Sequence, residues 1–173
     1  MITILEDNDN DCQLRKGKSA MSSPQWKPNT TVAAIIERDG RFLMVREQTD
    51  DGVRLNQPAG HLEYGETLLQ AVVREAREET AHTFTPRALV GIYLADKAGS
   101  DITYLRFAFC GDAGAYDPAQ RLDDGILAAE WLSADEIMAS AALWRSPLVG
   151  RCLQDYLAGQ RASLDLIHHH LPG

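Results

Sequence analysis

The chain has 173 residues, of which 45% are hydrophobic and 24% charged, a composition typical of one globular domain. Its net charge of −8 argues against binding to nucleic-acid polymers or anionic membranes, but a bound cation could still attract a small phosphorylated metabolite. No apolar run could span a bilayer, the start lacks a signal-peptide pattern, and the three cysteines are too widely spaced to indicate a disulfide framework or a zinc site. We therefore expect a cytoplasmic protein, either a monomer or a homodimer.

The N-terminal half begins with residues 1–27, which are polar and lack periodicity, so we expect a flexible arm there. Strands are predicted at 30–37 and 41–47, because both runs are rich in β-branched or aromatic residues and Asp39-Gly40 between them favours a hairpin turn. Residues 48–60 are expected to form a loop, since proline and glycine interrupt any regular pattern.

Helical periodicity begins at Thr67, which forms a capping box with Gln70, and extends to Thr80. The expected apolar stripe of this helix consists of Leu68, Leu69, Val72, Val73 and Ala76. Further strands are predicted at 88–96, 101–111 and 125–133, and further helices at 134–140, behind a second capping box of Ser133 and Glu136, and at 146–159.

This order of elements predicts an α+β fold, in which helices pack on one mixed β-sheet within a single domain at 28–167. The remaining residues, 168–173, are expected to form an unstructured tail that begins with three histidines.

A cluster of carboxylates lies on the first predicted helix. Glu75, Glu78 and Glu79 fall within one turn, and Glu66 lies just upstream. Like charges at this spacing repel each other, and the repulsion can be relieved by protonation, by arginine or by a metal ion. Two arginines cannot neutralise four carboxylates, and hard oxygen ligands favour Mg²⁺, with Mn²⁺ as a substitute. The alternative interpretation is a solvated acidic face with internal salt bridges.

The same residues carry a family resemblance. The pattern Gly-x5-Glu-x7-Arg-Glu-x-x-Glu-Glu resembles the Nudix box, and a chance match is on the order of 10⁻⁷ per window. The matching residues are Gly60, Glu66, Arg74, Glu75, Glu78 and Glu79. The chain departs from the pattern at Ala81, where the box has glycine, and at His82, where it has an aliphatic residue. Loss of the glycine cap is expected to alter the end of the helix.

Segments outside the box, within about 28–167, also resemble phosphatases of the Nudix hydrolase superfamily. The resemblance implies an α/β/α sandwich. It also implies Mg²⁺-dependent hydrolysis of phosphoanhydride bonds in nucleoside tri- and diphosphates and in thiamine-related pyrophosphates, with release of phosphate. Three alternatives remain open: another diphosphate-linked metabolite, 5′-triphosphorylated RNA, and a non-catalytic domain that senses nucleotides.

The expected roles of the box residues follow from this resemblance and from the chemistry of carboxylates. Glu75, Glu78 and Glu79 would bind the metal ion, and the carbonyl of Ala59 or Gly60 would add a ligand. Either Glu78 or Glu79 would accept a proton from the attacking water, and the sequence does not choose between them. Arg74 would orient these carboxylates, with Glu66 as its partner.

Candidate substrate-binding residues lie outside the helix. Guanidinium groups match phosphate geometry, and the residue before a helix start is well placed to meet an anion. The candidates for phosphate are Arg46, Arg54, Arg106 and Arg145, and those for a base are Gln57 and Tyr104. The strand arginines would equally suit a solvated face, and the tyrosine would equally suit packing. Asp123 is expected to serve mainly in a turn, although its carboxylate could join the site.

Overall fold

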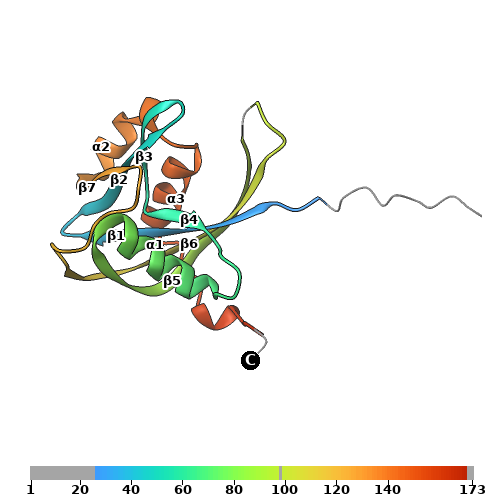
Figure 1. Ribbon diagram of the computed structural model, residues 1–173. Coiled ribbons are helices and arrows are strands. Elements are labelled where there is room, and N and C mark those ends of the chain that lie inside the picture. Colours follow the sequence, from blue (N-terminus) through green and yellow to red (C-terminus); the bar gives the residue numbers. More distant parts are fainter. Residues whose placement is uncertain (1–25, 98, 171–173) are drawn as a thin grey trace, which may run out of the picture.

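The computed structural model describes residues 26–97 and 99–170 (Figure 1). The expected arm therefore lies almost entirely outside the described residues, and the domain boundaries stay a prediction. None of the helices in the described ranges has the length and apolar character needed to cross a membrane. The elements in chain order are β1 (Asn29–Arg38), β2 (Arg41–Thr49), β3 (Gly52–Asn56), β4 (Ala59–His61), α1 (Leu68–Thr80), β5 (His82–Asp96), β6 (Thr103–Tyr116), β7 (Ile126–Ser133), α2 (Ala134–Ala139), the 3₁₀ turn η1 (Ala141–Leu143), α3 (Leu148–Leu157) and the 3₁₀ turn η2 (Leu164–Leu166).

The seven strands form one mixed sheet in the order β3-β2-β1-β6-β5, with β4 added beside β1 and β7 beside β2. Strand β1 is parallel to β6, and the other pairings are antiparallel. Strand β1 pairs with β6 along most of its length but with β2 only at its C-terminal end, around Glu37 and Arg38. The sheet therefore consists of two halves that β1 joins, and the predicted α+β fold with a mixed sheet is confirmed.

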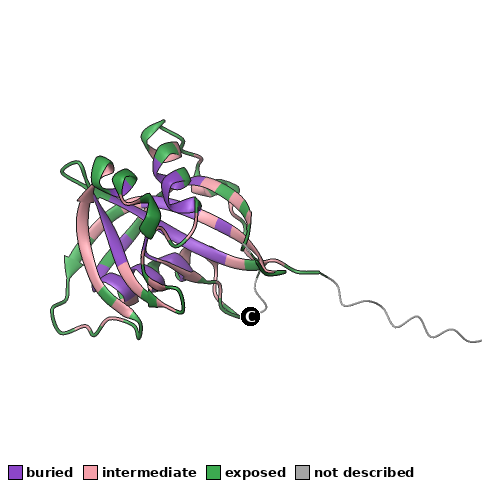
Figure 2. Cartoon of the chain, turned by 90° about the horizontal axis from the view of Figure 1, so that it is seen from above, coloured by how far each residue is buried: buried purple, intermediate pink, exposed green. Residues whose placement is uncertain are grey.

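Helices cover both faces of the sheet (Figure 1). Alternate residues of β1 enter two separate cores: Val32, Ala34 and Ile36 pack with α1, while Ala33 and Ile35 pack with α2 and α3. Figure 2 shows the buried residues concentrated along these central strands. The result is the expected three-layer α/β/α arrangement. Because both faces of β1 are covered, its sequence contains an unbroken apolar run.

Helix α1 begins as predicted, because both hydrogen bonds of the capping box between Thr67 and Gln70 are present. Its buried face differs from the predicted stripe. Val73 is exposed, whereas Ala71, Glu75 and Glu79 are buried together with Val72 and Ala76. The helix is therefore rotated relative to the prediction, so that Glu75 and Glu79 face the sheet and Val73 does not.

The predicted loop at 48–60 is wrong, since it contains strands β3 and β4. A tight turn joins β2 to β3: Thr49 Oγ1 donates to the Gly52 carbonyl at 2.8 Å, and Gly52 has a φ of 96°, which glycine adopts readily. Pro58 lies between the two short strands, where its missing N–H costs no ladder bond, and its carbonyl accepts from the Ala34 N–H at 2.8 Å.

Strands β5 and β6 extend beyond their predicted ends. Strand β5 begins at His82 and passes through Pro86, where the register with β6 shifts between Pro86 and Ala88. A proline fits such an irregularity because no regular ladder bond is lost there.

Farther along the chain, His169 Nε2 accepts a hydrogen bond from the Leu68 N–H at 3.1 Å, so this part of the expected tail contacts the start of α1.

Candidate active site

The carboxylates of the box lie where α1 meets β4. Glu75 and Glu79 are only 7% and 9% exposed, while Glu78, the third member, is less deeply buried. The three side chains project from about one turn of a helix whose apolar residues hold it against the sheet. This acidic cluster is therefore shielded from the water that would otherwise weaken its internal repulsion.

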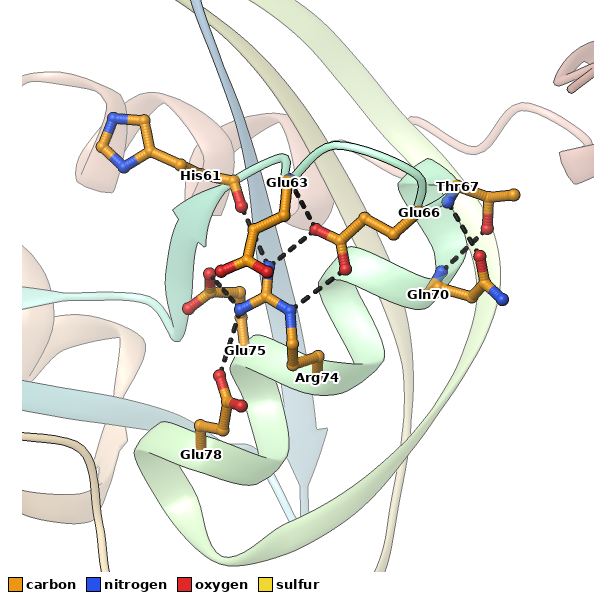
Figure 3. Close-up of polar contacts among 8 residues, drawn as sticks. All are labelled: His61, Glu63, Glu66, Thr67, Gln70, Arg74, Glu75 and Glu78. Carbon is orange, nitrogen blue, oxygen red and sulfur yellow. Dashed lines mark hydrogen bonds and ion pairs between the residues drawn. The ribbon is translucent and has the colours of Figure 1, made fainter. Parts of the chain in front are cut away.

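Arg74 is the centre of the cluster, as Figure 3 shows. Its Nη1 donates to Glu75 Oε1 at 2.8 Å and to Glu78 Oε2 at 3.0 Å. Its other nitrogens donate to both oxygens of Glu66, at 3.0 and 2.7 Å, and to the His61 carbonyl at 3.0 Å. The hydrogen bond to Glu66, followed by those to Glu75 and Glu78, raises the pKa of Arg74, while the same contact lowers the pKa of Glu66. Arg74 thus orients the carboxylates, with Glu66 as its main partner.

Strand β4 lies against the cluster and contacts it through its backbone. The Ala59 N–H donates to Glu79 Oε2 at 2.8 Å, and the Glu75 carboxylate lies so close to Gly60 that a Cβ there would overlap it. Glycine at this position is therefore required by a side chain on another element. The metal-ligand role of the Ala59 or Gly60 carbonyl stays a prediction.

Burial is the main cause that raises the pKa of Glu79 to about 8, and the Ala59 N–H only partly offsets it. Burial likewise raises the pKa of Glu75, against the lowering effect of Arg74. The carboxylate of Asp123 adds to both shifts, and the Asp123 N–H donates to the Glu78 carbonyl at 3.0 Å. Asp123 therefore lies at the edge of the cluster and does more than form a turn.

The carboxylate oxygens of Glu75, Glu78 and Glu79 fit a hard divalent cation, because such cations prefer oxygen ligands and would offset the repulsion between the carboxylates. Among the described residues, no three His, Cys, Asp or Glu side chains converge closely enough to hold a metal ion. The reason is visible in the contacts: Arg74 draws Glu75 and Glu78 to itself, while Glu79 turns to the Ala59 N–H.

A buried cation lies near these carboxylates. Arg106 on β6 is 8% exposed, and its Nε and Nη1 have no hydrogen-bond partner. Burial lowers its pKa, against the raising effects of the Cys152 thiol and of the carboxylates of Glu47 and Glu79. Leaving buried donors unpaired is costly, so this guanidinium is available to an oxygen-rich ligand.

Glu47 on β2 is a site residue that the sequence analysis missed. Its Oε1 is buried without a hydrogen bond, 3.6 Å from Arg145 Nε, and burial raises its pKa against the effects of Arg145, Asn56 and Arg106. Glu47 is therefore ion-paired with Arg145, and its charge also acts on Arg106. The signal in the sequence was a carboxylate that follows the apolar run 42–45 of this strand.

The other candidate substrate residues have different surroundings. Arg46 is ion-paired with Glu130 on β7. Gln57 is buried: its Nε2 donates to the Val149 carbonyl at 2.9 Å, and its Oε1 is unpaired. The ring of Tyr104 lies 6.2 Å from that of His61, and Arg54 lies opposite Glu47 in the β2–β3 register. Their roles in binding phosphate or base stay predictions.

Comparison with known proteins agrees with this geometry. The model of the NUDIX domain family matches residues 26–152. The chain is 38% identical over 145 residues to phosphatase NudJ from Escherichia coli K12 and, equally, from Shigella flexneri, covering 82% of this chain and 92% of each relative. The chain belongs to the Nudix hydrolase family.

A solved structure of a NUDIX hydrolase from Nitrosomonas europaea is 50% identical to this Nudix hydrolase, with a TM-score of 0.81, and the match covers 83% of this chain and 98% of that one. The crystal structure of UDP-X diphosphatase, at 19% identity and a TM-score of 0.65, shares the fold over 83% of this chain and 70% of its own. Members of this family hydrolyse pyrophosphate bonds in small phosphorylated molecules, and the curated relative NudJ is a phosphatase.

The departure from the Nudix box at Ala81 leaves the end of α1 intact. Ala81 has a φ of 59° and a ψ of 11°, the left-handed conformation that glycine takes there, and its N–H donates to the Arg77 carbonyl at 2.8 Å. The expected change in local geometry is therefore absent from this helix end. An alanine held in this conformation costs roughly 1–2 kcal/mol.

Substitution of Gly60 by alanine tests the close contact with Glu75. Because the overlapping atoms are at the end of a flexible side chain, Gly60→Ala should displace the carboxylate without unfolding the protein. We expect hydrolysis to fall on the order of 100-fold, the cost typical of a misplaced catalytic group, with an unchanged melting temperature.

The matched control is Gly114→Ala. A Cβ there would overlap the Thr83 hydroxyl, again at the end of a side chain but far from the acidic cluster, so it should leave hydrolysis unchanged. Equal loss of activity in both variants would contradict a specific role for the Gly60 contact.

Proposed function

We propose that this Nudix hydrolase uses Mg²⁺, with Mn²⁺ as a substitute, to cleave phosphoanhydride bonds of nucleoside tri- and diphosphates and of thiamine-related pyrophosphates, releasing phosphate. One observation carries the proposal: the buried guanidinium of Arg106, whose Nε and Nη1 have no hydrogen-bond partner, lies close enough to the carboxylate cluster for Glu79 to raise its pKa. A cation at the carboxylates and an anion at the arginine are the two charges of a metal–phosphate complex. The 38% identity to phosphatase NudJ supports the substrate class.

Glu75, Glu78 and Glu79 would bind the metal ion, which when bound polarises phosphoryl oxygens and lowers the pKa of water. The chain's own contribution is to hold these groups in place. Arg74 keeps Glu75 and Glu78 in one orientation through hydrogen bonds of 2.8 and 3.0 Å. The water's proton would pass to Glu78 or Glu79, both of which project from the same turn of α1.

The substrate's phosphates would bind at Arg106 and Arg145, with the other candidates Arg46, Arg54, Gln57 and Tyr104 farther from the reacting bond. Glu47 is ion-paired with Arg145, 3.6 Å from its Nε, and the charge of Glu47 also acts on Arg106 without a hydrogen bond. Phosphoryl transfer depends mainly on such charge placement and on orientation, so two arginines near one carboxylate suit the reaction.

Phosphorus NMR of the products tests the function directly. With a nucleoside triphosphate or thiamine pyrophosphate, orthophosphate should appear only when Mg²⁺ is present, because repelling carboxylates alone cannot neutralise the substrate. Glu78→Gln should lose nearly all turnover, while Glu63→Gln, at an exposed position of the same box, should keep it.

Pyrophosphate released from the triphosphate would move the attack to an inner phosphorus and contradict the phosphatase assignment. Absence of product from either compound would contradict the proposed substrates. Equal activity with and without Mg²⁺ would contradict the role of the carboxylates.

A second prediction concerns Arg106. Arg106→Lys keeps the charge but loses the planar fork that binds two phosphate oxygens. We expect KM for the triphosphate to rise about 10- to 100-fold, as for the loss of one charged hydrogen bond, with a much smaller change in kcat. The matched control is Arg87→Lys, at an exposed ion pair with Asp112. An unchanged KM with a lowered melting temperature would show that Arg106 is only a structural cation.

A further inference from the structure

A cavity of about 420 Å³ lies at the C-terminal end of α1, between the β2–β7 half of the sheet and the β5–β6 half. Its volume falls within the range of small-molecule sites. Its wall includes Leu43, His82, Tyr116, Gln120, Leu122 and Trp131. Glu75, Glu78 and Glu79 are not among the lining residues, so the cavity is separate from the acidic cluster.

Aromatic rings gather at this cavity. The ring of His82 lies 5.1 Å from that of Tyr116 and 6.0 Å from that of Trp131. The guanidinium of Arg38 lies over Trp131, 4.8 Å from the ring centroid. Tyr116 is 60% exposed, so much of its ring stays in contact with water. An open aromatic face beside a cavity favours a flat ligand, since any planar ring can stack on it.

His82 supplies a polar group within this apolar wall. The residue is 9% exposed, and its Nδ1 lies 3.4 Å from the Gly114 carbonyl. This contact assigns the hydrogen to Nδ1, which leaves Nε2 as an acceptor with no partner among the described residues. Burial lowers the pKa of His82, which keeps the ring neutral. Because His82 lines the cavity, this acceptor can take a hydrogen bond from an N–H or O–H donor of a ligand there.

We propose that this cavity binds a planar, uncharged nitrogen heterocycle with N–H donors, the chemistry of a nucleobase, stacked against Tyr116 and hydrogen-bonded to His82. The histidine stands where the Nudix box has an aliphatic residue, so the box itself does not require a polar group here. The apolar parts of the ring would contact Leu43 and Leu122.

The cavity is connected to the acidic cluster through one short segment. Leu122 lines the cavity, and the next residue, Asp123, donates its N–H to the Glu78 carbonyl at 3.0 Å. The ligand has two possible sources with the same chemistry: the base of the substrate itself, or a separate molecule that alters the rate through Asp123. Binding in the cavity does not depend on the proposed hydrolysis.

Titration with free nucleosides tests the proposal, because they carry no phosphoanhydride bond and require no Mg²⁺. The NMR signals of the His82 imidazole and the Trp131 indole should shift and saturate at millimolar nucleoside. Tyr116→Ala should weaken binding about tenfold, which corresponds to the loss of one base–aromatic stack. His82→Leu, which restores the aliphatic residue of the box, should also weaken it. Trp26→Ala, at an exposed aromatic residue that does not line the cavity, should bind as the wild type does.

Kinetics with a nucleoside triphosphate then distinguish the sources. A raised KM in Tyr116→Ala identifies the ligand as the substrate's base, whereas an unchanged KM with a rate altered by added nucleoside identifies a separate effector. Both outcomes support the site. The proposal is overturned if no nucleoside shifts the two signals, or if Tyr116→Ala, His82→Leu and Trp26→Ala all bind nucleoside as the wild type does.

Discussion

The hydrogen bonds of Arg74 are the interaction on which the site depends. One guanidinium contacts Glu66, Glu75 and Glu78, and so allows carboxylates to lie together on a helix face that the sheet covers. Arg74 makes no hydrogen bond to Glu79. The Glu79 carboxylate instead accepts a hydrogen bond from the Ala59 N–H, and burial raises its pKa to about 8, which favours its neutral form. Residual repulsion is what a divalent cation would remove.

Much of this arrangement could be predicted from local sequence. The spacing of the box gives the helix and the position of each carboxylate, and both capping boxes, at Thr67 and at Ser133, form as predicted. Local patterns were less informative where the structure depends on partners far along the chain. Strands β3 and β4 exist because β2 and β1 pair with them, which a stretch containing proline and glycine does not reveal.

The rotation of α1 and the position of Glu47 were not predicted from the sequence, because both also depend on partners far along the chain. Helical spacing places Glu75 and Glu79 on the face of Val72 and Ala76, but only the fold shows that β4 accepts the two carboxylates there, through Gly60 and the Ala59 N–H. Glu47 on β2, Arg106 on β6 and Arg145 in the segment before α3 come close only in the folded protein. Ala81 keeps the left-handed conformation of the usual glycine, with its N–H bonded to the Arg77 carbonyl and its carbonyl to the Asp117 N–H.

The measurement that tests this account most directly is the free energy of unfolding of the wild type and of Glu79→Gln, each in EDTA and in Mg²⁺. Glutamine keeps the hydrogen bond to the Ala59 N–H but carries no charge. The account predicts that the variant is at least as stable as the wild type in EDTA, and that Mg²⁺ at 100 times its Kd stabilises only the wild type, by about 2.7 kcal/mol. A variant that is less stable in EDTA, or that gains as much from Mg²⁺ as the wild type, would contradict it.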